Sequence, residues 1–311
     1  MKRLALLLLV VFVQIGCSVS DHGPLGVLLP FTVPEGGIQL VFSVTADMRD
    51  FSGDNPDYFR GACERIASGG AGSFMISVGD IDPPDMVYGT IGDYIDGSYI
   101  WYPVVGNHEA ETSSDMQWLR NFNAGGSSLP NVVRNGPANC LETTYSFDYG
   151  EVHFVVLNEY FDGASDVGTD GDVSDALHSW LTDDLDANTK PIVLVLGHEP
   201  AYPLPDADSG RLRHETDSLN AHVTNRDRFW TTLSSHSVAA YICGHTHNYS
   251  VEKLDGVWQV DAGHARGTGD TGSRSTFLMF YIMSNGDVWY YTYRLNPESS
   301  QYELGYTGRL D

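Results

Sequence analysis

Residues 39–47 read QLVFSVTAD, a run of β-forming residues that stops at Asp47. The same pattern returns in four later segments: FMISVGD at 74–80, YIWYPVVGNHE at 99–109, PIVLVLGHE at 191–199 and VAAYICGHTH at 238–247. A buried strand that stops at Gly plus Asp, Asn or His delivers a polar side chain to one edge of a sheet. Five such strand ends supply carboxylates, an amide and imidazoles, a set of side chains that suits a pair of divalent cations.

The segments between these strands predict an α/β fold. Residues 55–70 and 225–236 have the pattern of helices, and so do residues 174–188, where Ser174 is a candidate N-cap. An acidic loop is expected between the strands at 74–80 and 99–109. Hairpins are expected at Gly150-Glu151 and Asn285-Gly286. Strand–helix alternation followed by hairpins favours layered mixed sheets within one domain over residues 37–311. The polar segment 201–224 is long enough to form a loop that borders a site.

Composition limits the classes of partner. The chain has 311 residues, of which 42% are hydrophobic and 19% charged, so it can bury a large core. Its net charge is −24, which excludes a nucleic acid held by a basic face. A small phosphorylated substrate remains compatible, because cations in a site can override the overall field.

The N-terminus predicts export. Lys2 and Arg3 precede an apolar run, and Gly16-Cys17 follows it, so residues 1–16 have the pattern of a signal peptide. Cys17 is placed as in a bacterial lipoprotein, with residues 17–36 as its tether, and a lipid on this cysteine would be the only membrane contact. Ordinary secretion stays open, because Gln14 stands where an aliphatic residue is usual, and a buried N-terminal helix is the third interpretation.

Three further cysteines follow: Cys63, Cys140 and Cys243. In an exported chain a Cys63–Cys140 disulfide is conceivable, but spacing alone does not establish it. Cys243 lies inside an apolar strand, where a small buried residue is expected.

The order of the motifs resembles the calcineurin-like metallophosphoesterase superfamily, which includes the purple acid phosphatases. Asp, then Gly-Asp, then Gly-Asn-His-Glu, then a lone His after a strand, then Gly-His-x-His occur in that order over about residues 38–265. The resemblance implies a four-layer αββα sandwich, in which two mixed β-sheets are flanked by helices and the metal ions lie at strand ends.

The resemblance also implies roles for the motif residues. Asp80 would bridge two divalent cations of Zn, Mn or Fe. Asn107, His198 and His245 would complete one site, and Asp47 and His247 would belong to the other. Catalysis would use His108, which faces the substrate as an acid, and Glu109, which orients His108 or is simply a solvated acid.

The first motif departs from the family pattern. Most of the superfamily has Asp-x-His, whereas this chain has Asp47-Met48-Arg49, and Arg offers no lone pair to a metal ion. Purple acid phosphatases supply a Tyr three residues after the bridging Asp, but that position is Pro83 here. One metal site is therefore complete, and the second lacks a ligand that Asp82, Asp50 or water would have to supply. Arg49 either contacts the substrate phosphate or pairs with a nearby Asp.

Other polar and aromatic residues carry weaker signals. His264 follows a late strand and is expected at the rim of the pocket, while Asn158 is expected in a structural turn. The aromatic run at 289–293 fits a core strand. Five histidines have no motif around them and are expected in packing or at the surface: His153, His178, His214, His222 and His236.

These features together predict an exported metallophosphoesterase, which hydrolyses phosphoric monoesters or diesters outside the cytoplasm by means of a metal-bound hydroxide, with His108 as acid or charge stabiliser. One alternative is a degenerate, non-catalytic lipoprotein that binds phosphate or metal, an interpretation prompted by Arg49. The other is a related hydrolase of non-phosphate esters.

Overall fold

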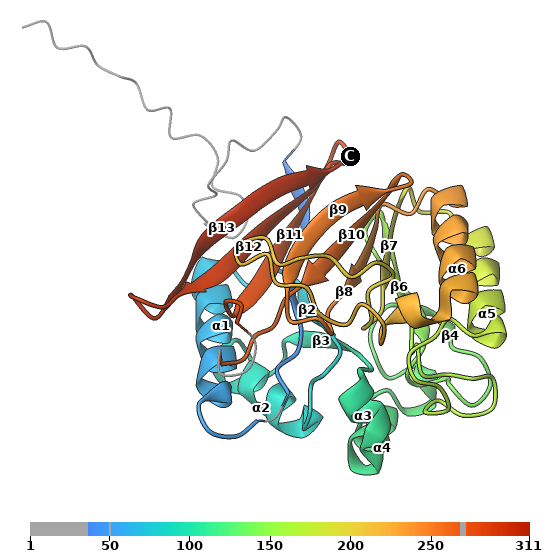
Figure 1. The fold of residues 1–311 in the computed structure, drawn as a ribbon, viewed down its shortest axis with the longest axis horizontal. Coiled ribbons are helices and arrows are strands. Elements are labelled where there is room, and N and C mark those ends of the chain that lie inside the picture. The colour runs from blue at the N-terminus through green and yellow to red at the C-terminus, as the bar shows by residue number, and fades with distance from the viewer. Residues whose placement is uncertain (1–36, 50, 268–271) are drawn as a thin grey trace, which may run out of the picture.

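The computed structural model describes residues 37–49, 51–267 and 272–311 (Figure 1). The expected signal peptide, the expected tether and Asp50 lie outside these residues. Within the described ranges, no helix combines the length and the apolar character needed to cross a membrane.

Two mixed β-sheets form the centre of the fold. The first sheet has six strands in the order β13-β12-β11-β1-β2-β3, and the second has seven in the order β4-β5-β6-β7-β8-β10-β9. The strands of the first sheet are β1 (Ile38–Thr45), β2 (Phe74–Val78), β3 (Ile100–Val104), β11 (Thr276–Met283), β12 (Val288–Asn296) and β13 (Gln301–Leu310). Those of the second are β4 (Val132–Asn135), β5 (Tyr145–Tyr149), β6 (Val152–Val156), β7 (Ile192–Leu196), β8 (Ala240–Cys243), β9 (Tyr249–Leu254) and β10 (Val257–Ala262).

Helices cover the outer face of each sheet. Figure 1 shows α5 and α6 together at one flank of the molecule and α1 and α2 at the other. The helices are α1 (Asn55–Gly69), α2 (Pro84–Tyr94), α3 (Asn107–Glu111), α4 (Ser113–Phe122), α5 (Asp175–Ala187) and α6 (Val223–Ser235). One apolar cluster joins α1, α2 and α4 to the first sheet, and another joins α5 and α6 to the second. The predicted four-layer sandwich is thus confirmed.

The core between the two sheets explains why β1 is apolar on both faces. Phe42 points into this core, where its ring stacks on Phe280 at 5.0 Å between centroids and meets the edge of Phe154 at 5.3 Å. Val41, one residue earlier, packs on the opposite face against the helices. The period of two along a strand therefore fills two different cores, because each sheet is covered on both sides.

Parallel pairing brings the polar strand ends to a common edge. β1, β2 and β3 are parallel neighbours in the first sheet, and β6, β7, β8 and β10 are parallel neighbours in the second. Parallel strands have their carboxyl ends on the same side, so the residues that follow them share one edge. The His245 amide donates to Asp47 Oδ2 at 3.0 Å, which joins the edges of the two sheets.

Several local expectations need correction. The acidic loop expected before β3 contains helix α2, whose apolar residues Val87 and Ile91 are buried against the first sheet. Strand β13 was not predicted, since most of its residues are exposed and it has no continuous apolar run. The conceivable Cys63–Cys140 disulfide is wrong, because both thiols are free and lie in the two different helix-facing cores.

Candidate metal centre

The polar strand ends share an uncommon backbone conformation. Four of the predicted ligands have left-handed φ angles: Asp47 (52°), Asp80 (51°), His245 (69°) and His247 (58°). Residues with a Cβ occupy this region rarely and at a cost of about 1–3 kcal/mol each. Such strain persists only where the surrounding structure enforces it, and its repetition at one edge points to a functional site.

Glycines allow these strand ends to approach closely. A Cβ on Gly79, whose φ is +85°, would lie 2.2 Å from His198 Nδ1. A Cβ on Gly244 would lie 2.6 Å from Asp47 Oδ2. Each distance is shorter than any real contact, so the Gly that precedes the ligand is required by the geometry of the site.

Two histidines present nitrogen lone pairs to each other. His198 Nδ1 is 2.8 Å from the Val78 carbonyl, and His245 Nε2 is 3.0 Å from the Asp217 carbonyl. A carbonyl only accepts, so these two nitrogens carry the ring hydrogens. His198 Nε2 and His245 Nδ1 then face each other as bare nitrogens at 3.3 Å. Burial lowers the pKa of both imidazoles, which keeps them neutral.

Two oxygens complete this cluster, which we call the His198 half-site (Asp80, Asn107, His198 and His245). Asp80 Oδ1 lies 3.3 Å from His198 Nε2, and Asn107 Oδ1 is buried with no hydrogen-bond partner among the described residues. His198 Nε2 thus has two electron-rich neighbours, Asp80 Oδ1 and His245 Nδ1, with no hydrogen between them, and such atoms repel one another in a dry interior. A divalent cation that prefers nitrogen and oxygen ligands relieves this repulsion, so these residues fit a metal ion.

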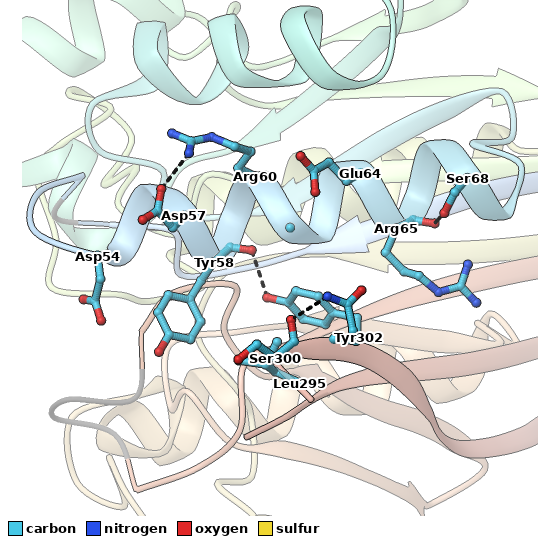
Figure 2. Close-up of a pocket in the computed structure, with 12 residues that line it drawn as sticks. Asp54, Asp57, Tyr58, Arg60, Glu64, Arg65, Ser68, Leu295, Ser300 and Tyr302 are labelled. Carbon is cyan, nitrogen blue, oxygen red and sulfur yellow. Dashed lines mark hydrogen bonds and ion pairs between the residues drawn. The ribbon is translucent and has the colours of Figure 1, made fainter. Parts of the chain in front are cut away.

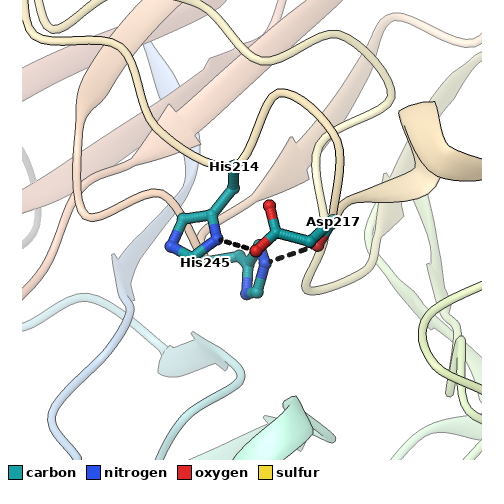
Figure 3. A group of neighbouring side chains, drawn as sticks. All are labelled: His214, Asp217 and His245. Atoms are coloured by element: carbon teal, nitrogen blue, oxygen red, sulfur yellow. Dashed lines mark hydrogen bonds and ion pairs between the residues drawn. The ribbon is translucent and has the colours of Figure 1, made fainter.

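The loop over residues 201–224 borders the His198 half-site, as predicted. Figure 3 shows His214 and Asp217 on this loop above His245. The His214 ring lies 4.2 Å from the His245 ring, and its Nδ1 is 3.0 Å from Asp217 Oδ2. His214 was expected at the surface or in packing, because no motif surrounds it. Its contacts, together with the Asp217 carbonyl, hold His245 with Nδ1 directed at the other ligands.

The second cluster, the Asp47 half-site, contains Asp47, Asp80 and His247. Ligand atoms of these three residues lie within 4.8 Å of one another, close enough to hold an ion. His247 Nε2 is 3.3 Å from Asp47 Oδ1. Burial raises the pKa of Asp47 and, together with the charge of Asp47, raises the pKa of Asp80 to about 7. Nearby positive charge is therefore needed to keep both carboxylates ionised.

Two arginines approach the Asp47 half-site. Arg49 Nη1 lies 3.7 Å from Asp80 Oδ2, and Arg213 Nη1 lies 2.9 Å from His247 Nδ1. Arg49 was expected either at the substrate or beside an Asp, and the structure places it beside the Asp80 carboxylate. Arg213 belongs to the 201–224 loop, and no sequence motif identified it. Asp82, one of the residues considered as an additional ligand, faces His108 instead.

His108 and Glu109 have different surroundings from those expected. His108 Nδ1 lies 3.6 Å from Asp82 Oδ2 and its Nε2 lies 3.9 Å from Asp80 Oδ2, while a quarter of its side chain remains exposed. Glu109 does not orient this ring and is not solvated. It is fully buried, and its two oxygens accept from the Ile81 amide at 2.8 Å and the Gly106 amide at 2.7 Å. Glu109 therefore fixes the turns that carry Asp80 and Asn107, and Asp82 takes the orienting position.

The weaker candidates are structural. His264 is fully buried, with Nε2 3.3 Å from the Ser273 carbonyl, so it lies behind His247 and not at a rim. Burial and the nearby His247 lower its pKa to about 3. Asn158 forms the expected turn, since its amide donates to Thr143 Oγ1 and to the Asp166 carbonyl.

Glu159, a buried residue that no sequence motif predicted, holds the backbone at His198. Glu159 Oε2 accepts from the backbone amides of His198 at 2.9 Å and Glu199 at 2.7 Å. Its other oxygen accepts from the Tyr241 hydroxyl. Burial raises the pKa of Glu159 to about 7 against these hydrogen bonds. The sequence carries no motif for this contact, because it depends on β6 and β7 lying side by side.

A large surface groove lies elsewhere. It has a volume of about 760 Å³ and runs along α1 where this helix faces the β12–β13 turn (Figure 2). Asp57, Glu64 and Tyr302 are among its lining residues, and none of the predicted ligands is. The predicted metal ligands therefore lie outside this groove.

Comparison with known proteins supports the same assignment of fold. The structure of GAP50, the anchor in the inner membrane complex of Plasmodium, is similar with a TM-score of 0.54 and 15% identity, over 88% of this chain and 89% of that one. The structure of PhoD is similar with a TM-score of 0.57 and 12% identity, over 90% of this chain and 71% of that one. At such identities the likeness shows the fold alone. Comparison with curated protein sequences gives no match. The family model for calcineurin-like phosphoesterases matches residues 28–249, so the chain belongs to that family of metal-dependent phosphoesterases.

Proposed function

We propose that this protein hydrolyses phosphoric esters with the help of a divalent metal ion of the Zn, Mn or Fe type. The observation that carries the proposal is the convergence of the bare nitrogens of His198 and His245 with Asp80 Oδ1 in the His198 half-site. A cation held there would supply Lewis-acid chemistry at a phosphoryl group and would lower the pKa of water. Asp80, Asn107, His198 and His245 hold that cation at the sheet edge.

His108 is proposed as the acid of this reaction. Its ring is partly exposed and lies beside Asp80, so a substrate that enters the centre meets Nε2. Burial lowers the pKa of His108, but the nearby carboxylates of Asp82 and Asp80 outweigh burial and raise it overall. A protonated ring can neutralise charge on the phosphoryl group or give its proton to the leaving oxygen, a contribution of about 10²–10⁴-fold.

A small phosphorylated molecule is the proposed substrate class. The chain has a net charge of −24, which opposes binding of a polyanion such as nucleic acid. Local positive charge at the centre, from the metal ion, Arg49 and Arg213, attracts a single phosphate group in spite of that field. Monoesters and diesters are both candidate substrates.

The activity is tested with the purified protein loaded with Mn, Zn or Fe and assayed on an aryl phosphomonoester and an aryl phosphodiester. We expect turnover that a chelator abolishes and that His108→Asn lowers by about 10²–10⁴-fold. His236→Asn is the matched control, because its ring pairs with Asp186 at the surface and should leave turnover unchanged. Metal-loaded protein without turnover above that of His108→Asn would overturn the proposal.

We also propose that the protein acts outside the cytoplasm. Residues 1–17 support this through their basic start, apolar run and Gly16-Cys17. A lipoprotein is released from the membrane fraction by Cys17→Ser, and it carries label from a fatty-acid precursor only when Cys17 is present. A secreted chain appears in the medium without label, and a chain that stays in the cytoplasm contradicts both forms of the proposal.

A non-catalytic binding protein is the second candidate function. It is favoured by the arginines at the Asp47 half-site. Binding of phosphate or metal without turnover of either ester supports this candidate. The partly exposed His108 beside Asp80 weighs against it, because a binding site needs no acid there.

A further inference from the structure

We infer that Arg49 and Arg213 take the place of one metal ion, so that the centre holds a single cation beside an arginine-lined phosphate subsite. This inference deepens the proposed function and rests on it for the identity of the substrate. It concerns the Asp47 half-site, which the His198 half-site adjoins through Asp80.

The hydrogen-bond pattern of His247 opposes metal binding. Arg213 Nη1 lies 2.9 Å from His247 Nδ1, and a guanidinium group has donors only. Nδ1 must therefore accept, which leaves the ring hydrogen on Nε2. Nε2 lies 3.3 Å from Asp47 Oδ1. A nitrogen that carries a hydrogen has no lone pair for a metal ion, so His247 is not available as a ligand in this arrangement.

The two oxygens of Asp80 are divided between the half-sites. Oδ1 lies 3.3 Å from His198 Nε2 and accepts from the His108 amide at 3.2 Å. Oδ2 faces Arg49 Nη1 at 3.7 Å and His108 Nε2 at 3.9 Å. Where a bridging carboxylate would offer its second oxygen to a second ion, this one meets a guanidinium group.

The charges balance without a second ion. Two guanidinium groups carry the same total charge as one divalent cation, and here Arg49 lies beside Asp80 while Arg213 contacts His247. Asp47 and Asp80 are almost completely buried, so compensation of their charge is required. The ligand atoms of Asp47, Asp80 and His247 lie close enough together to hold an ion, but the two arginines already supply positive charge there.

Arg49 and Arg213 also have exposed surface with which they can bind a substrate. The Arg49 side chain is 28% exposed, and its buried Nε has no hydrogen-bond partner among the described residues. Arg213 is half-buried on the polar loop that borders the centre. A planar guanidinium group binds two phosphate oxygens at once, so the same side chains that replace the ion can hold the phosphate that the remaining ion activates.

Metal stoichiometry tests the replacement directly. The protein is loaded with excess Mn²⁺, freed of unbound metal, and measured by elemental analysis and by electron paramagnetic resonance. We expect about one Mn²⁺ per chain with a single-ion spectrum. In the double variant Arg49→His/Arg213→Ala, we expect a rise toward two with the spectrum of a coupled pair. Two ions in the unaltered protein would overturn the inference, and so would a double variant that stays at one.

Binding of inorganic phosphate tests the subsite. Calorimetric titration of the protein loaded with Mn²⁺ should show that Arg49→Gln and Arg213→Gln each weaken binding by roughly tenfold to a hundredfold, because each removes a hydrogen bond to a charged group. Arg60→Gln is the matched control, since Arg60 pairs with Asp57 on the surface of α1. Unchanged affinity in both variants would overturn the subsite. A protein that binds one Mn²⁺ and phosphate but hydrolyses no ester contradicts the proposed activity alone.

Discussion

The two halves of the centre contain similar side chains but direct their hydrogens in opposite ways. In the His198 half-site, the ring hydrogens of His198 and His245 point outward to backbone carbonyls, and bare nitrogens point inward. In the Asp47 half-site, Arg213 donates to Nδ1 of His247, so the ring hydrogen is on Nε2, the nitrogen that lies 3.3 Å from Asp47 Oδ1. The contacts behind a ligand, and not the ligand alone, decide whether it can bind a metal ion.

Asp80→Asn should have the largest effect, because Asp80 is the residue that both half-sites share. An amide in its place removes the charge that holds the cation, and we expect the bound metal to fall to near zero. The rate of ester hydrolysis should fall by at least about 10³-fold, since Lewis-acid catalysis contributes several kcal/mol. Elemental analysis and steady-state kinetics measure both effects. Retention of one ion per chain would show that the half-sites do not depend on this carboxylate.

His198→Gln and His247→Gln compare the half-sites most directly. The first variant loses a bare nitrogen, and we expect bound metal to fall from about one ion per chain to near zero. The second loses a nitrogen that already carries a hydrogen, so bound metal should remain near one. Equal loss in the two variants would contradict the difference between the half-sites. Circular dichroism of both variants controls for unfolding.

Asp82→Asn should have a smaller effect, confined to His108. Asp82 Oδ2 faces the ring at 3.6 Å and holds no predicted ligand, so the metal content should not change. We expect kcat to fall by about tenfold, in the range typical of residues that orient a catalytic group.

Glu109→Gln should affect stability more than kcat, in contrast to Asp82→Asn. Because Glu109 binds the Ile81 and Gly106 amides, it should lower the melting temperature, with loss of metal following from displaced turns. If Glu109→Gln lowered kcat as much as Asp82→Asn without a change in melting temperature, Glu109 would be the residue that orients His108.

The sequence located the candidate ligands because Asn107, His198 and His245 each follow an apolar strand closely. Parallel pairing brings the strand ends of each sheet to one edge, and the contact between His245 and Asp47 joins the edges of the two sheets. Arg213, Asp217 and Glu159 could not be found in this way, because their positions depend on how a loop folds back and on which strands are neighbours. The role of Glu109 was wrong for a related reason. Adjacency to His108 in the chain suggested a contact, but a short helix turns the two side chains apart.

His153→Gln should have the smallest effect on metal content and ester hydrolysis. It is a reference variant, because His153 lies outside both half-sites. His153 is buried in the second sheet, with Nδ1 2.7 Å from Asp148 and Nε2 2.9 Å from Asp184. Burial lowers its pKa, but these two carboxylates outweigh burial and raise it. A raised pKa stabilises the folded state fully below the unfolded value of about 6.5, and the contribution is lost as pH rises through the folded value.

The stability difference between the unaltered protein and His153→Gln should therefore be larger at pH 6 than at pH 9. At pH 6 we expect about 1–3 kcal/mol, the contribution of a hydrogen bond to a charged group. Urea unfolding at the two pH values measures it, with ester hydrolysis at 25 °C unchanged. A difference that grows toward pH 9 would contradict the assignment.

The left-handed turns at Asp47, Asp80, His245 and His247 have a consequence for thermal tolerance. They follow strands of two different sheets, and each is held in its unfavourable conformation only while the sheets remain packed together. A rise in temperature that loosens this packing lets the four turns relax first, because they gain most from doing so. We therefore expect the centre to disperse while most strands are still paired, so that the proposed activity is lost at a lower temperature than the fold.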